Sequence, residues 1–405
     1  PLPGPGKSRR MQVGVRAQGG GPALAISVSH RLRGVPMSRA TATAGLPPLV
    51  ESSRLRLLTV LLFYIAQGIP LGLFYVAIPA YMASSGATPL QIASVVGMTS
   101  LPWTLKLVNG FIIDRYTYLA MGRRRAWIIG AQATIVLGCL CGAVLQPGGQ
   151  DVLLLSVLAF GVNMATTFQD VSIDSLAVDI MTEDEQGKAG GVMFGAQALG
   201  MSASGATCGF LIQTMGVGAG FAACAFGLAL VLGYGIMLRE RAGEKRLPWS
   251  PGMAHPHNVA VQVDAWLPLL KGSFRAILAP ISLLFVPFLL LRAIPIGGTE
   301  VYYPVLTQTF AGWSMTQFTS VQSSAILGSA IYALTLGGWI VGRFGGKRVL
   351  TIVLPMIAAF MLAVGLSKSL WSNGGLMAAV IWSQEFIGIT YAICVIPLAM
   401  RLCSP

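Results

Sequence analysis

The chain has 405 residues, of which 54% are hydrophobic and only 10% are charged. A soluble globular protein carries roughly 25% charged residues, so this chain has too little charge to cover an ordinary soluble surface. Its apolar residues come in blocks of about 20 or more, which is long enough for a helix to cross about 30 Å of hydrocarbon. The composition therefore predicts an all-α, polytopic membrane protein.

The formal net charge is +13, but we expect no nucleic-acid partner. The basic residues lie between the apolar blocks rather than on one soluble face, and an excess of Lys and Arg is typical of cytoplasmic loops. The six cysteines form no CxxC pair and lie within or at the ends of apolar segments. We expect no disulfide framework, no metal site and no cofactor.

Residues 1–56 are predicted to be a basic, disordered N-terminal tail, since residues 1–50 contain no Asp or Glu. Two interpretations remain open. The acid-free, Arg-rich tail resembles an organelle transit peptide, although such peptides are also amphipathic. Alternatively, residues 1–36 are a flexible extension or are not expressed, because a natural start occurs at Met37.

Ten apolar segments follow the tail and predict ten membrane-spanning helices. They lie at residues 57–82, 91–113, 126–145, 152–180, 189–212, 216–238, 279–303, 317–342, 349–367 and 375–401. The spacing predicts an N-terminal six-helix bundle over residues 57–238 and a central cytoplasmic loop over residues 239–278. Residues 279–405 are expected to form a C-terminal bundle in which four helices are present.

The basic residues predict the orientation of these helices. A cytoplasmic N-terminus places 24 of the 27 Lys and Arg residues on the cytoplasmic side, as the positive-inside rule requires. We therefore expect an integral, multi-pass membrane protein, acting as a monomer in the bilayer.

Two loops of the chain repeat one pattern. The second span ends in "GFIIDRYTYLAMGRRR" and the eighth in "GGWIVGRFGGKR". The pattern resembles the loop signature G-x-x-x-D-R-x-G-R-R of the major facilitator superfamily, with extra residues after Arg115 and with Gly342 in place of the second Asp. The resemblance implies a two-bundle fold of twelve helices. Since ten are present, we expect that the last pair is missing by truncation or was lost.

A narrower resemblance involves residues 60–200. The stretches "LPWTLK" and "FQDVSIDSLAVDIM" resemble the peptide and acetyl-coenzyme A transporter family, which includes the AmpG-like muropeptide permeases. The resemblance implies proton-coupled import of cell-wall fragments across a bacterial inner membrane. It equally implies acetyl-CoA transport across an organelle membrane if the N-terminal leader is real.

Polar residues within the first two spans are candidates for the substrate cavity. Gln67 lies in the first span, and Lys106 lies about 10 Å inside the second at a rise of about 1.5 Å per residue. Each also has a structural interpretation, because a glutamine can pack and a lysine can extend to the membrane surface.

Charged residues at the cytoplasmic ends of the helices predict a conformational gate. Asp114, Arg115 and Arg123 follow the second span, and Asp179 ends the fourth. A charge network between helices can bias a two-state equilibrium. For Arg123 and its neighbours, the alternative is that they serve membrane topology alone.

The fourth span carries the most informative polar residues. Asn163, Thr167, Asp170 and Asp174 are spaced i, i+4, i+7 and i+11 and share one helix face. An Asp facing lipid at mid-bilayer costs at least about 2.5–3.5 kcal/mol, so this face is expected to line a cavity. We expect Asp170 to be the proton-coupling site, assisted by Asp174, and Asn163, Thr167 and Gln169 to line the substrate cavity. A structural ion pair is the alternative for both acids.

The seventh span predicts an interrupted helix at Pro295, Gly297 and Gly298. Arg292 lies about halfway along it, where a guanidinium suits a carboxylate or phosphate of a substrate. An internal ion pair is the other interpretation of Arg292.

Together these features predict a secondary active transporter, proton-coupled, that moves a bulky anionic solute such as anhydro-muropeptide. Transport of acetyl-CoA is the first alternative, and a non-transporting scaffold or receptor is the second. We expect no enzyme, because the chain contains no P-loop, no G-x-S-x-G motif and only three histidines.

Overall fold

Helices form every regular element in the part of the chain that the computed structural model describes, residues 46–261 and 266–403. No strand occurs among these residues, so the predicted all-α class is confirmed. This composition suits a bilayer, where each backbone N–H and C=O must be satisfied within its own helix. Most of the predicted tail, including Met37, lies outside the described residues.

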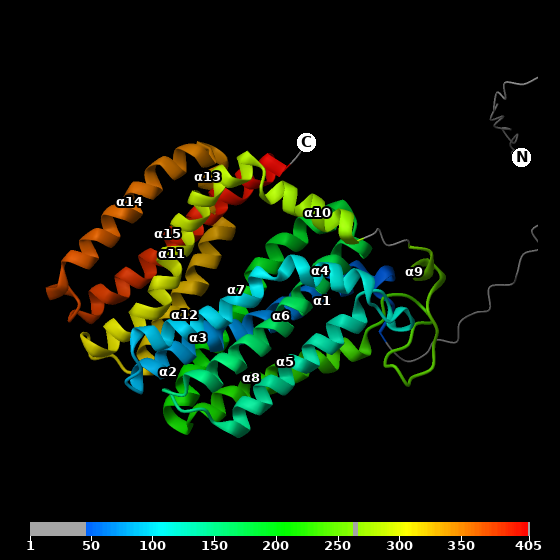
Figure 1. The fold of residues 1–405 in the computed structure, drawn as a ribbon, viewed down its shortest axis with the longest axis horizontal. Helices are drawn as coiled ribbons and strands as arrows, with labels where there is room; N and C mark the ends of the chain where they lie inside the picture. The colour runs from blue at the N-terminus through cyan, green and yellow to red at the C-terminus, as the bar shows by residue number, and fades with distance from the viewer. Residues whose placement is uncertain (1–45, 262–265, 404–405) are drawn as a thin grey trace, which may run out of the picture. The chain divides into compact units, whose positions relative to one another are not determined.

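The first half of the chain holds the six helical segments predicted there (Figure 1). Its elements are η1 (Leu49–Glu51), α1 (Ser53–Gly72), the π-helical turn η2 (Leu73–Ala77), α2 (Ile78–Ser84), α3 (Pro89–Thr104), α4 (Lys106–Arg115), η3 (Leu119–Met121), α5 (Arg125–Leu145), α6 (Val152–Ile180), α7 (Glu183–Met215) and α8 (Val217–Met237).

The connecting segment and the second half are also helical (Figure 1). Their elements are α9 (Pro256–Ala260), α10 (Trp266–Ile277), α11 (Pro280–Thr309), α12 (Met315–Tyr332), the π-helical turn η4 (Ala333–Gly337), α13 (Gly338–Phe344), α14 (Gly346–Leu366), η5 (Lys368–Leu370) and α15 (Gly374–Cys403).

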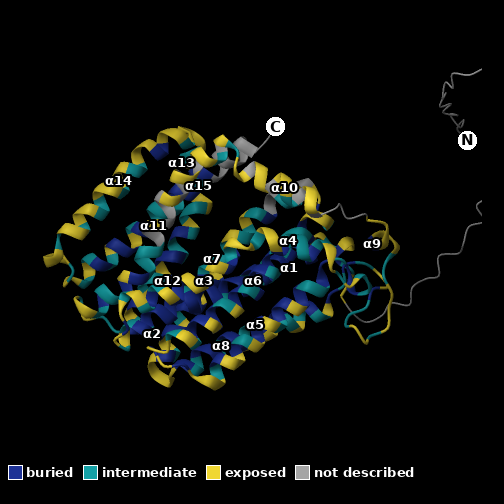
Figure 2. Ribbon diagram, in the orientation of Figure 1, coloured by how far each residue is buried: buried dark blue, intermediate teal, exposed yellow. Residues whose placement is uncertain are grey.

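Seven continuous helical stretches among the described residues are long and apolar enough to cross a membrane. They are Ser53–Ser84, Arg125–Leu145, Val152–Ile180, Val217–Met237, Met315–Phe344, Gly346–Leu366 and Gly374–Val395. The other three predicted spans coincide with α3–α4, α7 and α11, which are helices but are not among the seven. Figure 2 shows that α14 is largely exposed, and its exposed side chains, such as Ile352 and Leu362, are apolar. The chain is therefore an integral, multi-pass membrane protein.

Three predicted boundaries differ from the structure. Ordered chain begins before residue 57, because Leu49 is buried and its N–H donates to the carbonyl of Arg239 at 2.9 Å. The span predicted at 91–113 is divided at Leu105, three residues after Pro102, whose ring obstructs a regular helix. The break predicted around Gly297 and Gly298 is wrong, since α11 runs through both glycines. A continuous helix keeps the backbone satisfied at membrane depth.

Small residues allow α1 and α7 to pack with their backbones in contact. A Cβ added at Gly68 would overlap the carbonyl oxygen of Gln197, and one added at Gly200 would overlap that of Ile65. Further along α7, a Cβ at Gly209 would overlap the Thr319 hydroxyl of α12. Close approach of this kind drives helix association in a bilayer, where no hydrophobic effect separates helix from lipid. The glycine stripe of α7 therefore joins the two halves.

We expect Gly200→Val to lower the stability of the protein by at least about 3 kcal/mol, because the clash is with backbone atoms that a rotamer change does not relieve. The measurement is the melting temperature in detergent, followed by tryptophan fluorescence. Gly161→Val in α6 is the matched control, since a Cβ at Gly161 meets nothing within 4 Å. Equal melting temperatures for the two variants would contradict the packing argument.

Candidate functional site

The central feature of the first half is the buried carboxylate of Asp170 on α6, which is 3% exposed. The ammonium group of Lys106, at the start of α4, forms an ion pair with Asp170 Oδ2. The amide of Gln67 on α1 donates to Asp170 Oδ1 at 2.6 Å. Three helices therefore supply one charge-paired site, and breaking such a buried pair by removing one partner is costly.

Asp174 lies one helical turn further along α6 and shares the same cation. Its Oδ2 atom is 3.7 Å from Lys106 Nζ, and its Oδ1 atom accepts a hydrogen bond from the Tyr64 hydroxyl of α1. The Asp174 side chain is 43% exposed, whereas that of Asp170 is 4% exposed. Lys106, itself 39% exposed, thus bridges a buried and an accessible carboxylate.

A line of hydrogen bonds extends from Asp170 to α7. The Gln67 side chain that donates to Asp170 accepts, through its Oε1 atom, a hydrogen bond from the amide of Gln197. Gln197 lines a cavity of about 660 Å³ between the two halves of the chain. The buried ion pair and the cavity are therefore linked by two glutamine side chains.

The cavity has walls from both halves. The first half contributes η2 and α7, including Tyr75, and the second half contributes α11, α12, η4 and α15. Its polar lining in the second half consists of Thr299, Glu300, Tyr303, Gln322, Ser329, Gln384 and Glu385. Both π-helical turns contribute to it, and such turns are frequent at functional sites. A volume of this size suits a substantial small-molecule ligand.

The other residues predicted for the substrate cavity occupy different places. Asn163, Thr167 and Gln169 are 0% exposed and are not among the lining residues of the 660 Å³ cavity. Thr167 accepts a hydrogen bond from Asn109 Nδ2 at 2.8 Å, and Gln169 Nε2 donates to the Phe63 carbonyl at 3.3 Å. Their cavity role stays a prediction. The side chain of Arg292 lies outside the described ones.

The charged residues at the second end of the helices meet around Arg124. Its guanidinium forms ion pairs with Asp114 of α4 and, at 2.9 Å, with Asp179 of α6. Arg123 is more distant, with Nε 3.9 Å from Asp179 Oδ2. Burial opposes protonation of Arg124, but the two carboxylates outweigh it, and the pKa of Arg124 is raised.

The gate predicted from the sequence thus has a different centre. The structure brings Asp114 and Asp179 together through Arg124 rather than Arg123. The Arg115 side chain is exposed and, among the described residues, takes part in no ion pair. The GRRR run gave no signal as to which of its arginines faces α4 and α6.

Glu240, just after α8, anchors the start of α5. Its carboxylate accepts hydrogen bonds from the backbone N–H groups of Arg123, Arg124 and Arg125 at 2.7–2.8 Å. Burial and the charge of Glu244 raise the pKa of Glu240, and the three N–H groups oppose that rise. Anions are stabilised at helix N-termini, so Glu240 ties the central loop to the gate residues.

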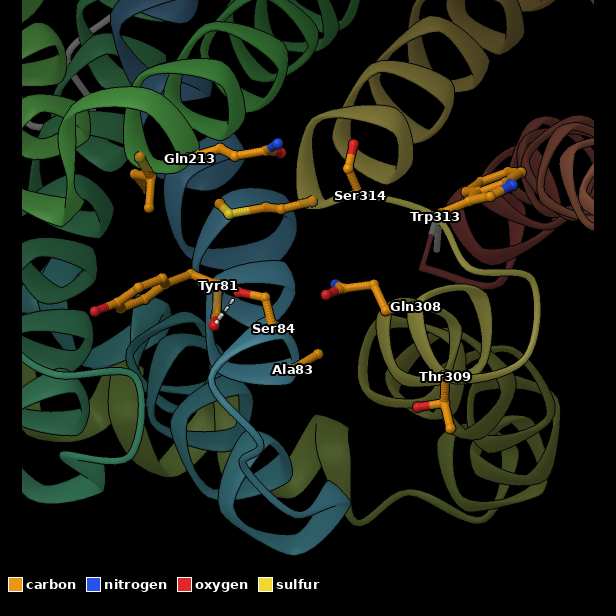
Figure 3. Close-up of a pocket in the computed structure, with 10 residues that line it drawn as sticks. Tyr81, Ala83, Ser84, Gln213, Gln308, Thr309, Trp313 and Ser314 are labelled. Atoms are coloured by element: carbon orange, nitrogen blue, oxygen red, sulfur yellow. Dashed lines mark hydrogen bonds between the residues drawn. The ribbon is translucent and has the colours of Figure 1, made fainter.

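The two halves also meet at the opposite end of the helices, around Ser84. A second cavity, of about 580 Å³, lies there between α2, α7 and the junction of α11 with α12. Figure 3 shows Tyr81 and Ser84 facing Gln308 across it. Gln308 Nε2 donates to the Ala80 carbonyl at 3.0 Å, and Gln213 Oε1 accepts from the Thr316 N–H at 2.7 Å. These bonds hold the halves together at the Ser84 end.

Several of these residues were missed at the level of sequence. Gln197 lies within a glycine-rich helix that reads as a packing surface, and Glu240 reads as one more loop charge. Neither position carries a local signal, because each partner lies far away in the chain. Among residues 46–261 and 266–403, no group of three His, Cys, Asp or Glu side chains is placed to hold a metal ion.

Comparison with known proteins places these features in a family. The family profile of the Major Facilitator Superfamily matches residues 57–404. The anhydromuropeptide permease of Escherichia coli K12 is 26% identical over 140 residues, which cover 35% of this chain and 28% of that protein. The folate-biopterin transporter of a Synechocystis strain is 27% identical over 189 residues, or 45% and 37% of the two chains. The chain thus matches well under half the length of these relatives.

One solved structure shares the fold. It is the crystal structure of a mutant of the nucleoside transporter NupG, with a TM-score of 0.53 and 12% sequence identity. The match covers 85% of this chain and 89% of that one. The two-bundle architecture predicted from the repeated loops is therefore confirmed at the level of the fold.

Proposed function

Because the chain belongs to the Major Facilitator Superfamily, we propose that it is a proton-coupled secondary transporter of a bulky anionic solute. The observation that carries this proposal is the line of hydrogen bonds from the cavity through Gln197 and Gln67 to Asp170. Such a line makes the state of the buried carboxylate sensitive to what occupies the cavity.

Lys106 provides the coupling in this proposal. Its ammonium group pairs with Asp170 while that carboxylate is ionised. When Asp170 takes up a proton, Lys106 loses its main partner and becomes available to an anionic group of the solute. When Asp170 loses the proton, Lys106 pairs with it again and the solute is released. A solute and a proton thus bind together, which is symport.

The contacts at the Ser84 end assign the conformation. We infer, from the distribution of Lys and Arg, that the Arg124 end and the N-terminus face the cytoplasm. The bonds made by Gln308 and Gln213 then close the outer side. Opening to the outside requires these bonds to break while the Arg124 network holds the inner side, as in the alternating-access mechanism of two-bundle transporters.

Anhydro-muropeptide is the solute we propose, because the permease that carries this name aligns over the part of the chain that supplies the Asp170 site. Acetyl-CoA is the alternative. In the first case we propose a bacterial inner membrane, in the second an organelle membrane, and in both a monomer.

The test is uptake of labelled anhydro-muropeptide into proteoliposomes under an imposed pH gradient, with excess acetyl-CoA in a parallel sample. We expect accumulation that requires the gradient and that acetyl-CoA leaves unchanged. Inhibition by acetyl-CoA would favour the alternative solute. Gradient-independent equilibration of the label would contradict proton coupling, and absence of any uptake of either compound would favour a scaffold or receptor.

A further inference from the structure

Two carboxylates of the second half face the 660 Å³ cavity and have no part in the coupling described above. Glu300 lies on α11 and Glu385 on α15. Gln322 of α12 donates to Glu385 Oε1 at 2.7 Å, which fixes the orientation of that carboxylate. Charged side chains at membrane depth are costly and are retained chiefly for function.

Two further side chains of the same cavity have unsatisfied oxygen atoms. The Tyr303 hydroxyl and the Gln384 carbonyl oxygen are buried, on residues 6% and 8% exposed, and neither has a hydrogen-bond partner in the described part of the protein. Both residues line the cavity. Since buried polar atoms are nearly always hydrogen-bonded, these two point to a ligand group that donates hydrogen bonds.

The charge of the lining decides which donor fits. Among the described residues that line the cavity, two are Glu and none is Lys or Arg. A carboxylate or phosphate would be repelled there. A primary ammonium group has three donors, one positive charge and no acceptor, which matches two carboxylates, a hydroxyl and a carbonyl oxygen.

We propose that Glu300, Tyr303, Gln384 and Glu385 form a subsite for a primary ammonium group of the transported solute. The proposal rests on the proposed function and narrows its substrate class. A solute that presents an anionic group to Lys106 and an ammonium group to this subsite is zwitterionic. A peptide-bearing cell-wall fragment with a free amine meets both requirements, whereas acetyl-CoA, whose charges are phosphates, does not.

The experiment compares two labelled anhydro-muropeptides in proteoliposomes, one with a free side-chain amine and the other acetylated on that amine. Wild-type protein is expected to have a KM about tenfold or more lower for the free amine, the value of one charge-assisted hydrogen bond. Glu385→Gln and Glu300→Gln are expected to remove this preference by raising the KM for the free amine alone. Glu51→Gln, at an exposed position before α1, is the control.

Three results would overturn the subsite. One is a wild-type protein that does not distinguish the two compounds, and another is an equal loss for both compounds in the variants, which would indicate a structural or proton-carrying role. Binding of both compounds to the detergent-solubilised protein, followed by the shift in melting temperature, separates the two proposals. A preference for the amine that Glu300→Gln removes would support the subsite even without uptake, whereas equal shifts would be the third contrary result.

Discussion

Asp170→Asn is expected to abolish accumulation driven by a pH gradient while leaving solute exchange intact. With one proton per solute, a gradient of one pH unit supports about tenfold accumulation, and the variant is expected to reach only about the external concentration. Asparagine keeps the shape of the side chain and the bond from Gln67, but it does not exchange a proton. The measurement is uptake into proteoliposomes with and without the gradient, alongside counterflow of labelled solute.

The control for this experiment is Asp184→Asn, which removes a carboxylate at the exposed start of α7. It is expected to accumulate solute like the wild type. Wild-type accumulation by Asp170→Asn as well would show that the pair with Lys106 is structural. Loss of counterflow in that variant would place Asp170 in solute binding rather than in coupling.

Glu240→Ala is expected to lower the free energy of unfolding by about 2–4 kcal/mol, because three N–H groups of the α5 N-terminus lose their acceptor. Glu240→Gln is expected to cost about 1 kcal/mol. Its remaining oxygen replaces Oε1, which serves Arg124 and Arg125, while its NH₂ group faces the N–H of Arg123. The melting temperatures in detergent should therefore fall in the order wild type, glutamine, alanine.

A second measurement follows the loop itself. The Arg125 guanidinium donates to the carbonyl groups of Lys245 and Arg246 at 2.7 and 2.6 Å, which holds this basic segment against the start of α5. When Glu240 no longer fixes α5, trypsin should cleave after these two residues sooner than in the wild type. Glu51→Ala, at an exposed position, should change neither result. Unchanged melting and cleavage in Glu240→Ala would refute the anchoring role.

Arg124 and Glu240 illustrate why the gate needed a tertiary structure. Glu240 holds the backbone of residues 123–125, and Arg124 then reaches Asp114 and Asp179. In the transport cycle that we propose, these bonds secure the inner side when the outer bonds of Gln308 and Gln213 break. Rearrangement between two packed states, rather than gradual deformation, is how such interfaces switch.

The sequence by itself determined the helical class, the number and order of the apolar helices and the family resemblance. It also singled out Asp170, because a carboxylate in an apolar helix is too costly to face lipid. These are local properties, readable from the length, hydrophobicity and spacing of neighbouring residues.

The tertiary structure decided which side chains share a site. Lys106 and Gln67 are far from Asp170 in the chain, and only the packing of α1, α4 and α6 makes them its partners. The same holds for Gln197, which faces Gln67 because glycines let α1 and α7 touch. Helix periodicity specifies a face but not the neighbour that covers it, since in a bilayer the choice of neighbour depends on close packing and interhelical hydrogen bonds.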